Sequence, residues 1–289
     1  MDKRLRWVRH KRVIAGAGLV SAAAAAVLAL AGAGRASGTV ADSGVTVVLP
    51  PPTPAIAITQ ARVPGRPIVL IDPGHGGQDP GATALSGDIT EKQLTLQFAR
   101  ELRDKLATDG RVRIALTRDD DRYLSLDERA ALARRIGASL YVSIHMDSAP
   151  NPLARGATVY SLSEVASDAE AAQLAAKSNA SMAATAGDDG SVNSILSNLA
   201  VRSQMKASAD FAERLVRSAQ RGVTLRPQPH QFADFAVLRD AGVPAVLFEA
   251  GYISNKDDEA ALRSPEQRAR IVAALARSIE ADIAARSLR

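Results

Sequence analysis

The sequence predicts an α/β fold built as one domain. From residue 68 on, short apolar segments alternate with longer segments in which apolar residues recur every three or four positions. This alternation is typical of strands and helices that follow one another in an α/β domain. The length of 289 residues and the hydrophobic content of 46% are sufficient for one full core with extra segments.

The first half of this domain contains three strands and two helices. Ile68 to Ile71 has the composition of a strand buried on both faces, and Asp72-Pro-Gly ends it. Residues 91–107 carry apolar side chains on one helical face, which Asp109-Gly110 closes. Residues 112–117 and 140–145 favour strands. Between them, residues 125–136 favour a helix with Ser125 as its cap and Glu128 in the capping-box position.

The second half adds strands at 156–162, 237–238 and 245–248. Residues 163–186 and 195–221 favour helices, joined by the flexible sequence Gly187-Asp-Asp-Gly190. A last amphipathic helix is expected at 265–285.

The N-terminus predicts export. Residues 1–12 contain six of the 36 Lys and Arg residues and one of the 31 Asp and Glu residues, which accounts for the whole net charge of +5. Residues 13–34 are uncharged, and Ala31-Gly-Ala33 resembles a cleavage site. We expect residues 1–34 to form a signal peptide or a signal anchor and favour cleavage. The uncleaved segment 13–34 would be long enough to anchor the protein in the inner membrane.

The rest of the chain is electrically balanced, with 30 basic and 30 acidic residues and 3% aromatic residues overall. This composition argues against nucleic acid as a partner. The absence of cysteine excludes disulfides and thiolate metal sites. Residues 35–67, which include Leu49-Pro-Pro-Pro-Thr-Pro54, predict a Pro-rich linker rather than a folded module. We expect a monomer.

Four residues at element ends are candidates for chemistry. His75 and His145 follow strands, Glu91 begins a helix and Glu249 follows the last strand. Two imidazoles and one carboxylate can hold a catalytic zinc ion, and a second carboxylate can then act on water. The spacing is weakly specific, because no compact metal-binding signature is present. A glycine-rich turn with a solvent-exposed histidine remains the alternative for residues 72–81.

Seven sequence blocks, taken together, resemble the zinc-dependent N-acetylmuramoyl-L-alanine amidases over residues 68–285. The blocks are Asp72-Pro-Gly-His-Gly-Gly-x-Asp-Pro-Gly81, Glu91-Lys92, Thr117-Arg118, Leu126-x-x-Arg129, Ser143-Ile-His-Met-Asp-Ser148, Arg155-Gly156 and Phe248-Glu-Ala-Gly-Tyr-Ile-Ser-Asn255.

The resemblance implies a mixed, mostly parallel sheet flanked by helices. It also implies zinc bound by His75, Glu91 and His145, with Glu249 as the catalytic carboxylate. The substrate would be peptidoglycan, cut between N-acetylmuramic acid and L-alanine, and the protein would be periplasmic. His-Met-Asp-Ser and the long helical insertion at about 162–223 are similar to the Gram-negative cell-division type, which acts in wall remodelling and daughter-cell separation. A zinc peptidase acting within the stem peptide, a catalytically silent peptidoglycan-binding protein and a structural envelope tether are the alternatives.

Two departures from that family concern regulation. Many division amidases carry a folded targeting domain before the catalytic domain, and residues 35–67 are too few for one. In regulated relatives a helix of the insertion covers the active site, and an acidic side chain of that region reaches the zinc. An activator protein relieves this inhibition. Residues 171–186 contain no acid. The candidate acids are Glu164, Asp168, Glu170, Asp188 and Asp189.

Several further residues carry two interpretations. Asp72 and Asp147 could orient the histidines or serve only in turns. For Arg118 and Arg129 we favour buried ion pairs, and for Asn255 a helix cap over a contact with substrate. His10 lies in the basic flank and His230 is expected in a solvated loop, so neither is a proposed ligand.

Overall fold

The computed structural model describes residues 56–180 and 192–287. The expectations for residues 1–34, for His10 and for most of the linker fall outside this part of the chain. Within the described ranges, no helix combines the length and apolarity that crossing a membrane requires.

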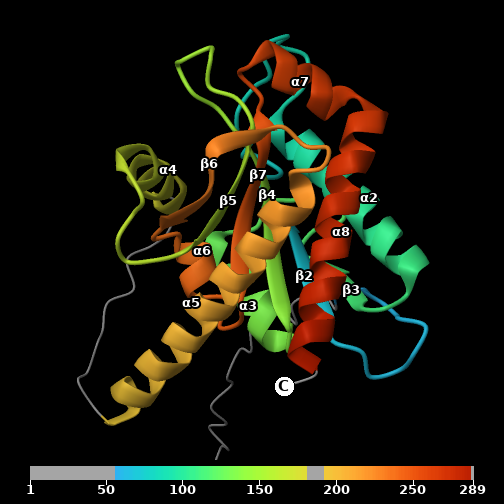
Figure 1. Cartoon of the computed structure of the whole chain (residues 1–289), viewed down its shortest axis with the longest axis vertical. Coiled ribbons are helices and arrows are strands. Elements are labelled where there is room, and N and C mark those ends of the chain that lie inside the picture. The colour runs from blue at the N-terminus through green and yellow to red at the C-terminus, as the bar shows by residue number, and fades with distance from the viewer. Residues whose placement is uncertain (1–55, 181–191, 288–289) are drawn as a thin grey trace, which may run out of the picture. The chain divides into compact units, whose positions relative to one another are not determined.

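A seven-stranded sheet forms the centre of the domain (Figure 1). Its order is β1-β3-β2-β4-β7-β5-β6. The strands are β1 (Ile58–Thr59), β2 (Ile68–Pro73), β3 (Arg113–Leu116), β4 (Leu140–Asp147), β5 (Ala157–Leu162), β6 (Leu225–Ala233) and β7 (Ala245–Tyr252). The pairs β1–β3 and β5–β7 are antiparallel and the other four are parallel. The predicted mixed, mostly parallel sheet is therefore confirmed.

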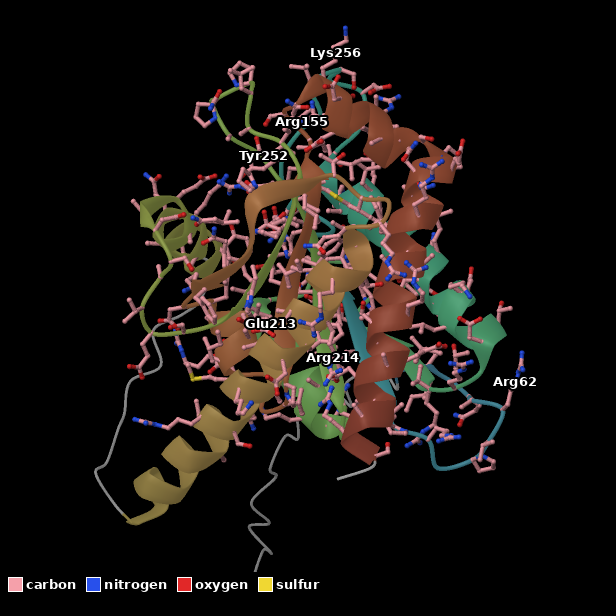
Figure 2. The ribbon with its side chains drawn as sticks, viewed as in Figure 1. Arg62, Arg155, Glu213, Arg214, Tyr252 and Lys256 are labelled. Atoms are coloured by element: carbon pink, nitrogen blue, oxygen red, sulfur yellow. The ribbon has the colours of Figure 1, made fainter. Side chains whose placement is uncertain are left out.

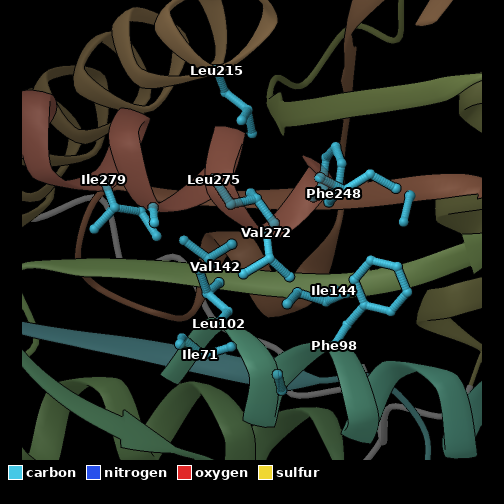
Figure 3. Packing of buried hydrophobic residues seen from close by; sticks show 14 of the residues in the cluster. Ile71, Phe98, Leu102, Val142, Ile144, Leu215, Phe248, Val272, Leu275 and Ile279 are labelled. Carbon is cyan, nitrogen blue, oxygen red and sulfur yellow. The ribbon is translucent and has the colours of Figure 1, made fainter. Parts of the chain in front are cut away.

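Helices cover both faces of the sheet. α2 (Glu91–Asp109), α5 (Val192–Ala219) and α8 (Pro265–Ser287) bury their apolar sides against one face. Figure 3 shows this layer, where Phe98, Leu215 and Leu275 meet side chains of the strands. α3 (Leu126–Arg135), α4 (Ala169–Asn179) and α6 (Ala236–Arg239) lie on the other face. α7 (Lys256–Arg263) packs against α8 and β7.

The helix ends follow local sequence signals. Ser125 caps α3 and forms the predicted capping box with Glu128. Gly110 ends α2 in the left-handed conformation, with a φ of 67°, which glycine adopts without steric cost. Asn255 accepts hydrogen bonds from the backbone N–H groups of Asp257 and Asp258, so the cap expected there is confirmed.

Three expected elements were wrong. Residues 225–233 form β6, whereas His230 was expected in a loop. Residues 237–238 belong to the short helix α6 instead of a strand. The end of the expected linker is also structured, because β1 pairs with β3 at the edge of the sheet.

The two helices of the insertion have different surroundings. α5 is part of the core, since Phe211 and Leu215 on it are almost fully buried. α4 begins at Ala169 and not at 163, and only Ala171 and Ala175 on it are buried.

Candidate active site

The loop after β2 carries His75 in a constrained backbone conformation. Its φ of 59° is the only positive φ of a non-glycine residue in the described chain. Two buried arginines hold this loop through its carbonyl oxygens. Arg118 donates to the carbonyls of Pro73 and Gly74, and Arg129 donates to those of Pro73 and His75. Such strain persists where the surrounding structure fixes it, which is common at functional sites.

His75, Glu91 and His145 come together at one point. Glu91 Oε1 lies 3.0 Å from His75 Nε2 and 3.0 Å from His145 Nδ1. One ligand atom from each residue falls within 4.8 Å of the others. The loop after β2 carries the first histidine, β4 contains the second and α2 begins with the glutamate, so the expected convergence at one sheet edge is observed.

The donor set fits a zinc ion. Zinc takes imidazole nitrogen and carboxylate oxygen at about 2.0–2.2 Å, which places tetrahedral ligand atoms roughly 3.3 Å apart. Asp79 Oδ2 lies 2.8 Å from His75 Nδ1, so this carboxylate fixes the ring with Nε2 directed to Glu91. Carboxylate partners of this kind orient metal-binding histidines. Sequence reasoning did not identify Asp79, although it stands four residues after His75.

Hydrogen bonds shape the charges of this cluster. Burial lowers the pKa of His75, but the bonds with Asp79 and Glu91 outweigh burial and raise it to about 9. Burial raises the pKa of Glu91, and the bonds with His145 and His75 outweigh it, so that the pKa lies well below its usual range. Glu91 is therefore ionised at neutral pH, and the ionised form is the one in which a carboxylate binds a metal ion.

Two glycines allow the cluster to close. A Cβ atom on Gly74 would lie 2.3 Å from the His145 ring, and one on Gly81 would lie 2.6 Å from Glu91 Oε2. Both contacts are shorter than packed atoms tolerate, and Gly81 also has a positive φ of 66°. The glycine-rich loop thus packs against the cluster, and His75 is only partly exposed, so the alternative of a solvent-exposed turn is wrong.

Glu249 lies beside the cluster within β7, directly opposite His145 on β4. It was expected just after a strand, and it is instead the fifth residue of a longer one. Its side chain is 3% exposed, and Oε2 has no hydrogen-bond partner. Burial, together with the charges of Asp147 and Glu91, raises the pKa of Glu249 well above its usual range. A raised pKa makes the ionised carboxylate a stronger proton acceptor, as general acid–base catalysis requires.

A pocket of about 890 Å³ contains all four residues. Its walls come from the β2 and β3–α3 loops on one side, including Tyr123, and from α4 on the other, including Leu174 and Lys177. The charge of Lys177 acts on Glu249 and opposes the rise of its pKa. α4 therefore forms one wall of the site.

The remaining sequence candidates have structural roles. Asp72 accepts hydrogen bonds from Thr117, Arg129, Tyr141 and Ser143 and not from either histidine, so it does not orient them through a hydrogen bond. Arg129 pairs with it as predicted. The expected ion pair of Arg118 is wrong, because its guanidinium donates to backbone carbonyls and to the hydroxyl of Thr95.

Asp147 accepts from the N–H of Ser148 and lines the pocket without a hydrogen bond to His145. His230 is half-buried and bonds to the hydroxyl of Ser161 through Nε2 at 2.7 Å, away from the cluster. Asp168 caps α4 and Glu170 pairs with Arg226, so neither is held by the His–Glu–His cluster. Glu164 is exposed, and Asp188 and Asp189 lie outside the described residues.

A His–Glu–His cluster beside an unpaired buried glutamate, at the edge of an α/β sheet, is typical of metal-dependent hydrolases. Residues 69–281 match the family model described as N-acetylmuramoyl-L-alanine amidase. The chain belongs to this family.

Curated relatives and solved structures agree with this assignment. The chain is 34% identical to the probable N-acetylmuramoyl-L-alanine amidase AmiB of Haemophilus influenzae, over 70% of its own length and 49% of the relative. It is 33% identical to AmiA of Escherichia coli, over 74% of its own length and 75% of the relative. It thus spans about half of the first relative and three quarters of the second.

Among solved structures, N-acetylmuramoyl-L-alanine amidase AmiC2 of Nostoc punctiforme aligns with a TM-score of 0.56 at 27% identity. The alignment covers 78% of this chain and 99% of that one. Ami1 of Mycobacterium smegmatis aligns with a TM-score of 0.54 at 27% identity, over 76% of this chain and 97% of that one.

Proposed function

We propose that the protein hydrolyses peptidoglycan at the amide bond between the lactyl group of N-acetylmuramic acid and L-alanine. One observation carries this proposal: the buried, unpaired carboxyl oxygen of Glu249 faces the same pocket as the His75–Glu91–His145 cluster. Membership of the amidase family supports the choice of this bond.

The cluster residues would hold the metal in this proposal. His75, Glu91 and His145 would bind zinc, and Asp79 would keep the His75 ring in the required orientation. When bound, the ion would supply a Lewis acid and lower the pKa of water from about 16 to about 7. Three protein ligands leave room for a further ligand from water or substrate.

Glu249 would act first as a general base and then as a general acid. Its Oε2 would accept the proton that water loses as it adds to the scissile carbonyl, and would return that proton to the L-alanine nitrogen as the C–N bond breaks. The pocket walls restrict water around this exchange, since Glu249 is 3% exposed.

The cellular role follows from the substrate. Peptidoglycan lies outside the inner membrane, so we propose a periplasmic protein that acts in wall remodelling and daughter-cell separation. Residues 1–34 would provide export, with either cleavage or retention as an anchor through residues 13–34.

We also propose that α4 restrains activity and that an activator protein relieves it. α4 contributes Leu174, Lys177 and Ser178 to the pocket wall and buries only two alanines. An element with so little buried apolar surface can detach at low cost, as a regulatory element must. A permanent structural helix is the competing interpretation.

Product analysis tests the proposed reaction. Purified peptidoglycan treated with the protein should release intact stem peptides and leave free lactyl groups on the glycan, and a chelator should stop the release. Mass spectrometry separates the alternatives. A peptidase would leave shortened peptides attached to the glycan, and a silent binding protein or tether would release nothing.

A further inference from the structure

Glu170 on α4 is held by hydrogen bonds from side chains of β6 and β7. Both carboxylate oxygens of Glu170 accept hydrogen bonds from Arg226, at 3.1 and 2.9 Å. The hydroxyl of Tyr252 donates a third bond to Glu170 Oε1 at 2.9 Å. The Arg226 guanidinium also lies 5.7 Å from the centre of the Tyr252 ring. A planar guanidinium with a phenol beside it is a well-organised carboxylate receptor.

This receptor lies at the same edge of the sheet as Glu249. Arg226 is the second residue of β6, and Leu225 before it pairs with Ala157 at the start of β5. The next residue of β5, Thr158, lies directly opposite Glu249. Tyr252 ends β7 three residues after Glu249 and pairs with Asp147, which lines the pocket. Figure 2 labels Tyr252, the last residue of β7.

Unpaired polar groups also occupy the sheet surface beside Glu249. Thr158 Oγ1, Tyr160 OH and Gln231 Oε1 have no hydrogen-bond partner, as is true of Glu249 Oε2. All of these side chains are at most 3% exposed. Thr158 and Tyr160 point to one face of β5, where Tyr160 pairs with Gln231 on β6. Buried polar groups without partners are rare in native proteins, and an ordered water, an ion or a polar ligand can satisfy them.

α4 lies over this surface through small side chains. Ala171 and Ala175 join Tyr160 and Phe235 in the cluster on this face. These alanines give the unpaired groups nothing to bond with. Glu170 bonds one end of the covering helix to the sheet, and Asn179 at the other end bonds to the backbone of residues 234 and 236.

We infer that Arg226 and Tyr252 form a carboxylate-binding subsite for the peptide part of the substrate, and that Glu170 occupies this subsite in the place of a substrate carboxylate. The identity of the peptide rests on the proposed function. A stem peptide that starts at the scissile amide near Glu249 would cross the first residues of β5 and reach Arg226 at the start of β6. Its first amide groups would meet Thr158 Oγ1 beside Glu249, and its carboxylate would replace Glu170 on Arg226 as α4 moves aside.

Two matched variants separate this subsite from a structural ion pair. Glu170→Gln and Arg226→Gln break the same pair and loosen α4 alike, but only the first keeps the receptor. The probe is L-alanyl-D-glutamate, titrated calorimetrically against the full chain, with the same dipeptide amidated at both carboxylates as a control. We expect Glu170→Gln to bind the free dipeptide at least tenfold more tightly than Arg226→Gln. The two variants should bind the amidated dipeptide equally. Tyr252→Phe combined with Glu170→Gln should weaken binding several-fold.

Equal binding of the free dipeptide by the two variants, or no detectable binding by either, would overturn the inference. If Arg226→Gln is unstable in thermal melting, Arg226→Lys gives the same comparison, because lysine keeps the charge and loses the two-pronged contact. The titration requires no hydrolysis. Failure of the proposed function would appear separately, as the absence of stem-peptide release from peptidoglycan by every variant.

Discussion

Asp72 and Arg129 form an ion pair with 2.6 Å between Oδ1 and Nη1, and both side chains are almost fully buried. Arg129 also donates to the carbonyls of Pro73 and His75. The pair therefore connects the end of β2 to the backbone that carries His75. A buried pair with all its hydrogen bonds satisfied contributes rigidity at this point, and losing one partner is costly.

Stability should depend on this pair at low pH. Burial raises the pKa of Asp72, but Arg129 and the hydrogen bonds from Thr117 and Tyr141 outweigh burial and hold the pKa far below its usual range. A depressed pKa in the folded state stabilises the protein above the unfolded pKa of about 3.9. This stabilisation is lost as pH falls from about 5 toward the folded pKa.

Asp72→Asn should therefore lower the free energy of unfolding by about 3–5 kcal/mol at pH 7, because it leaves Arg129 buried without its partner. Its unfolding free energy should fall less steeply than that of the original protein below pH 5. Urea unfolding between pH 3 and pH 7 measures both. The exposed Asp119, paired with Arg100 and Arg103, provides the control, and Asp119→Asn should change stability by less than about 1 kcal/mol. Equal curves for the two variants would contradict the prediction.

The sequence predicted the candidate metal ligands better than the residues that hold them in place. His75, His145 and Glu91 were found because strand ends and helix starts meet at one edge of a parallel sheet, a rule that needs no coordinates. The partners of Asp72 are 45 to 71 residues away in the chain, so no local pattern could reveal them. Asp79 is local to His75, but its contact depends on the positive φ of His75.

The missed elements also have physical reasons. β6 contains Pro227 and Pro229 and lacks alternating apolar residues, so its sequence argues against a strand. It is tolerated because β6 is the edge strand, where one side of the backbone needs no partner. α6 has only four residues, and Val237-Leu238 within it is equally compatible with a strand.

Replacing His145 by alanine should empty the metal site. Two remaining protein ligands seldom hold a catalytic zinc ion tightly. Elemental analysis of the purified variant should find much less than one zinc per chain. His230→Ala is the matched control, because it removes a half-buried histidine from β6 and should leave the zinc content unchanged. Full zinc occupancy in His145→Ala would refute the assignment.

Asp79 should control zinc affinity through His75. Asp79→Ala removes the acceptor at 2.8 Å from Nδ1, and loss of such a partner typically weakens metal binding about 10- to 100-fold. Asp79→Asn keeps an acceptor oxygen and should bind zinc more tightly than the alanine variant. Competition with a coloured zinc chelator measures both affinities. Identical affinities for Asp79→Ala and the original protein would show that the ring needs no orienting partner.

Glu249 should be required for turnover and dispensable for the metal. Glu249→Gln keeps the shape of the side chain but cannot take a proton, so release of stem peptides should fall by about 10²-fold or more. Zinc content should stay unchanged. If zinc disappears together with activity, Glu249 is a ligand instead, and near-normal release would exclude it from the reaction.

The contact of α4 with the sheet should limit the rate. Ala175 is 4% exposed, and Ala175→Asp would bury a charge without a partner, which favours detachment of the helix. A loss of about 1–2 kcal/mol in this contact raises the open fraction about 5- to 30-fold while the closed state dominates. Peptidoglycan digestion by the full chain should accelerate within that range. Ala172→Asp adds the same charge on the exposed side of α4 and should leave the rate unchanged. A folded, zinc-loaded Ala175→Asp protein with an unaltered or lower rate would show that α4 is a permanent wall of the site.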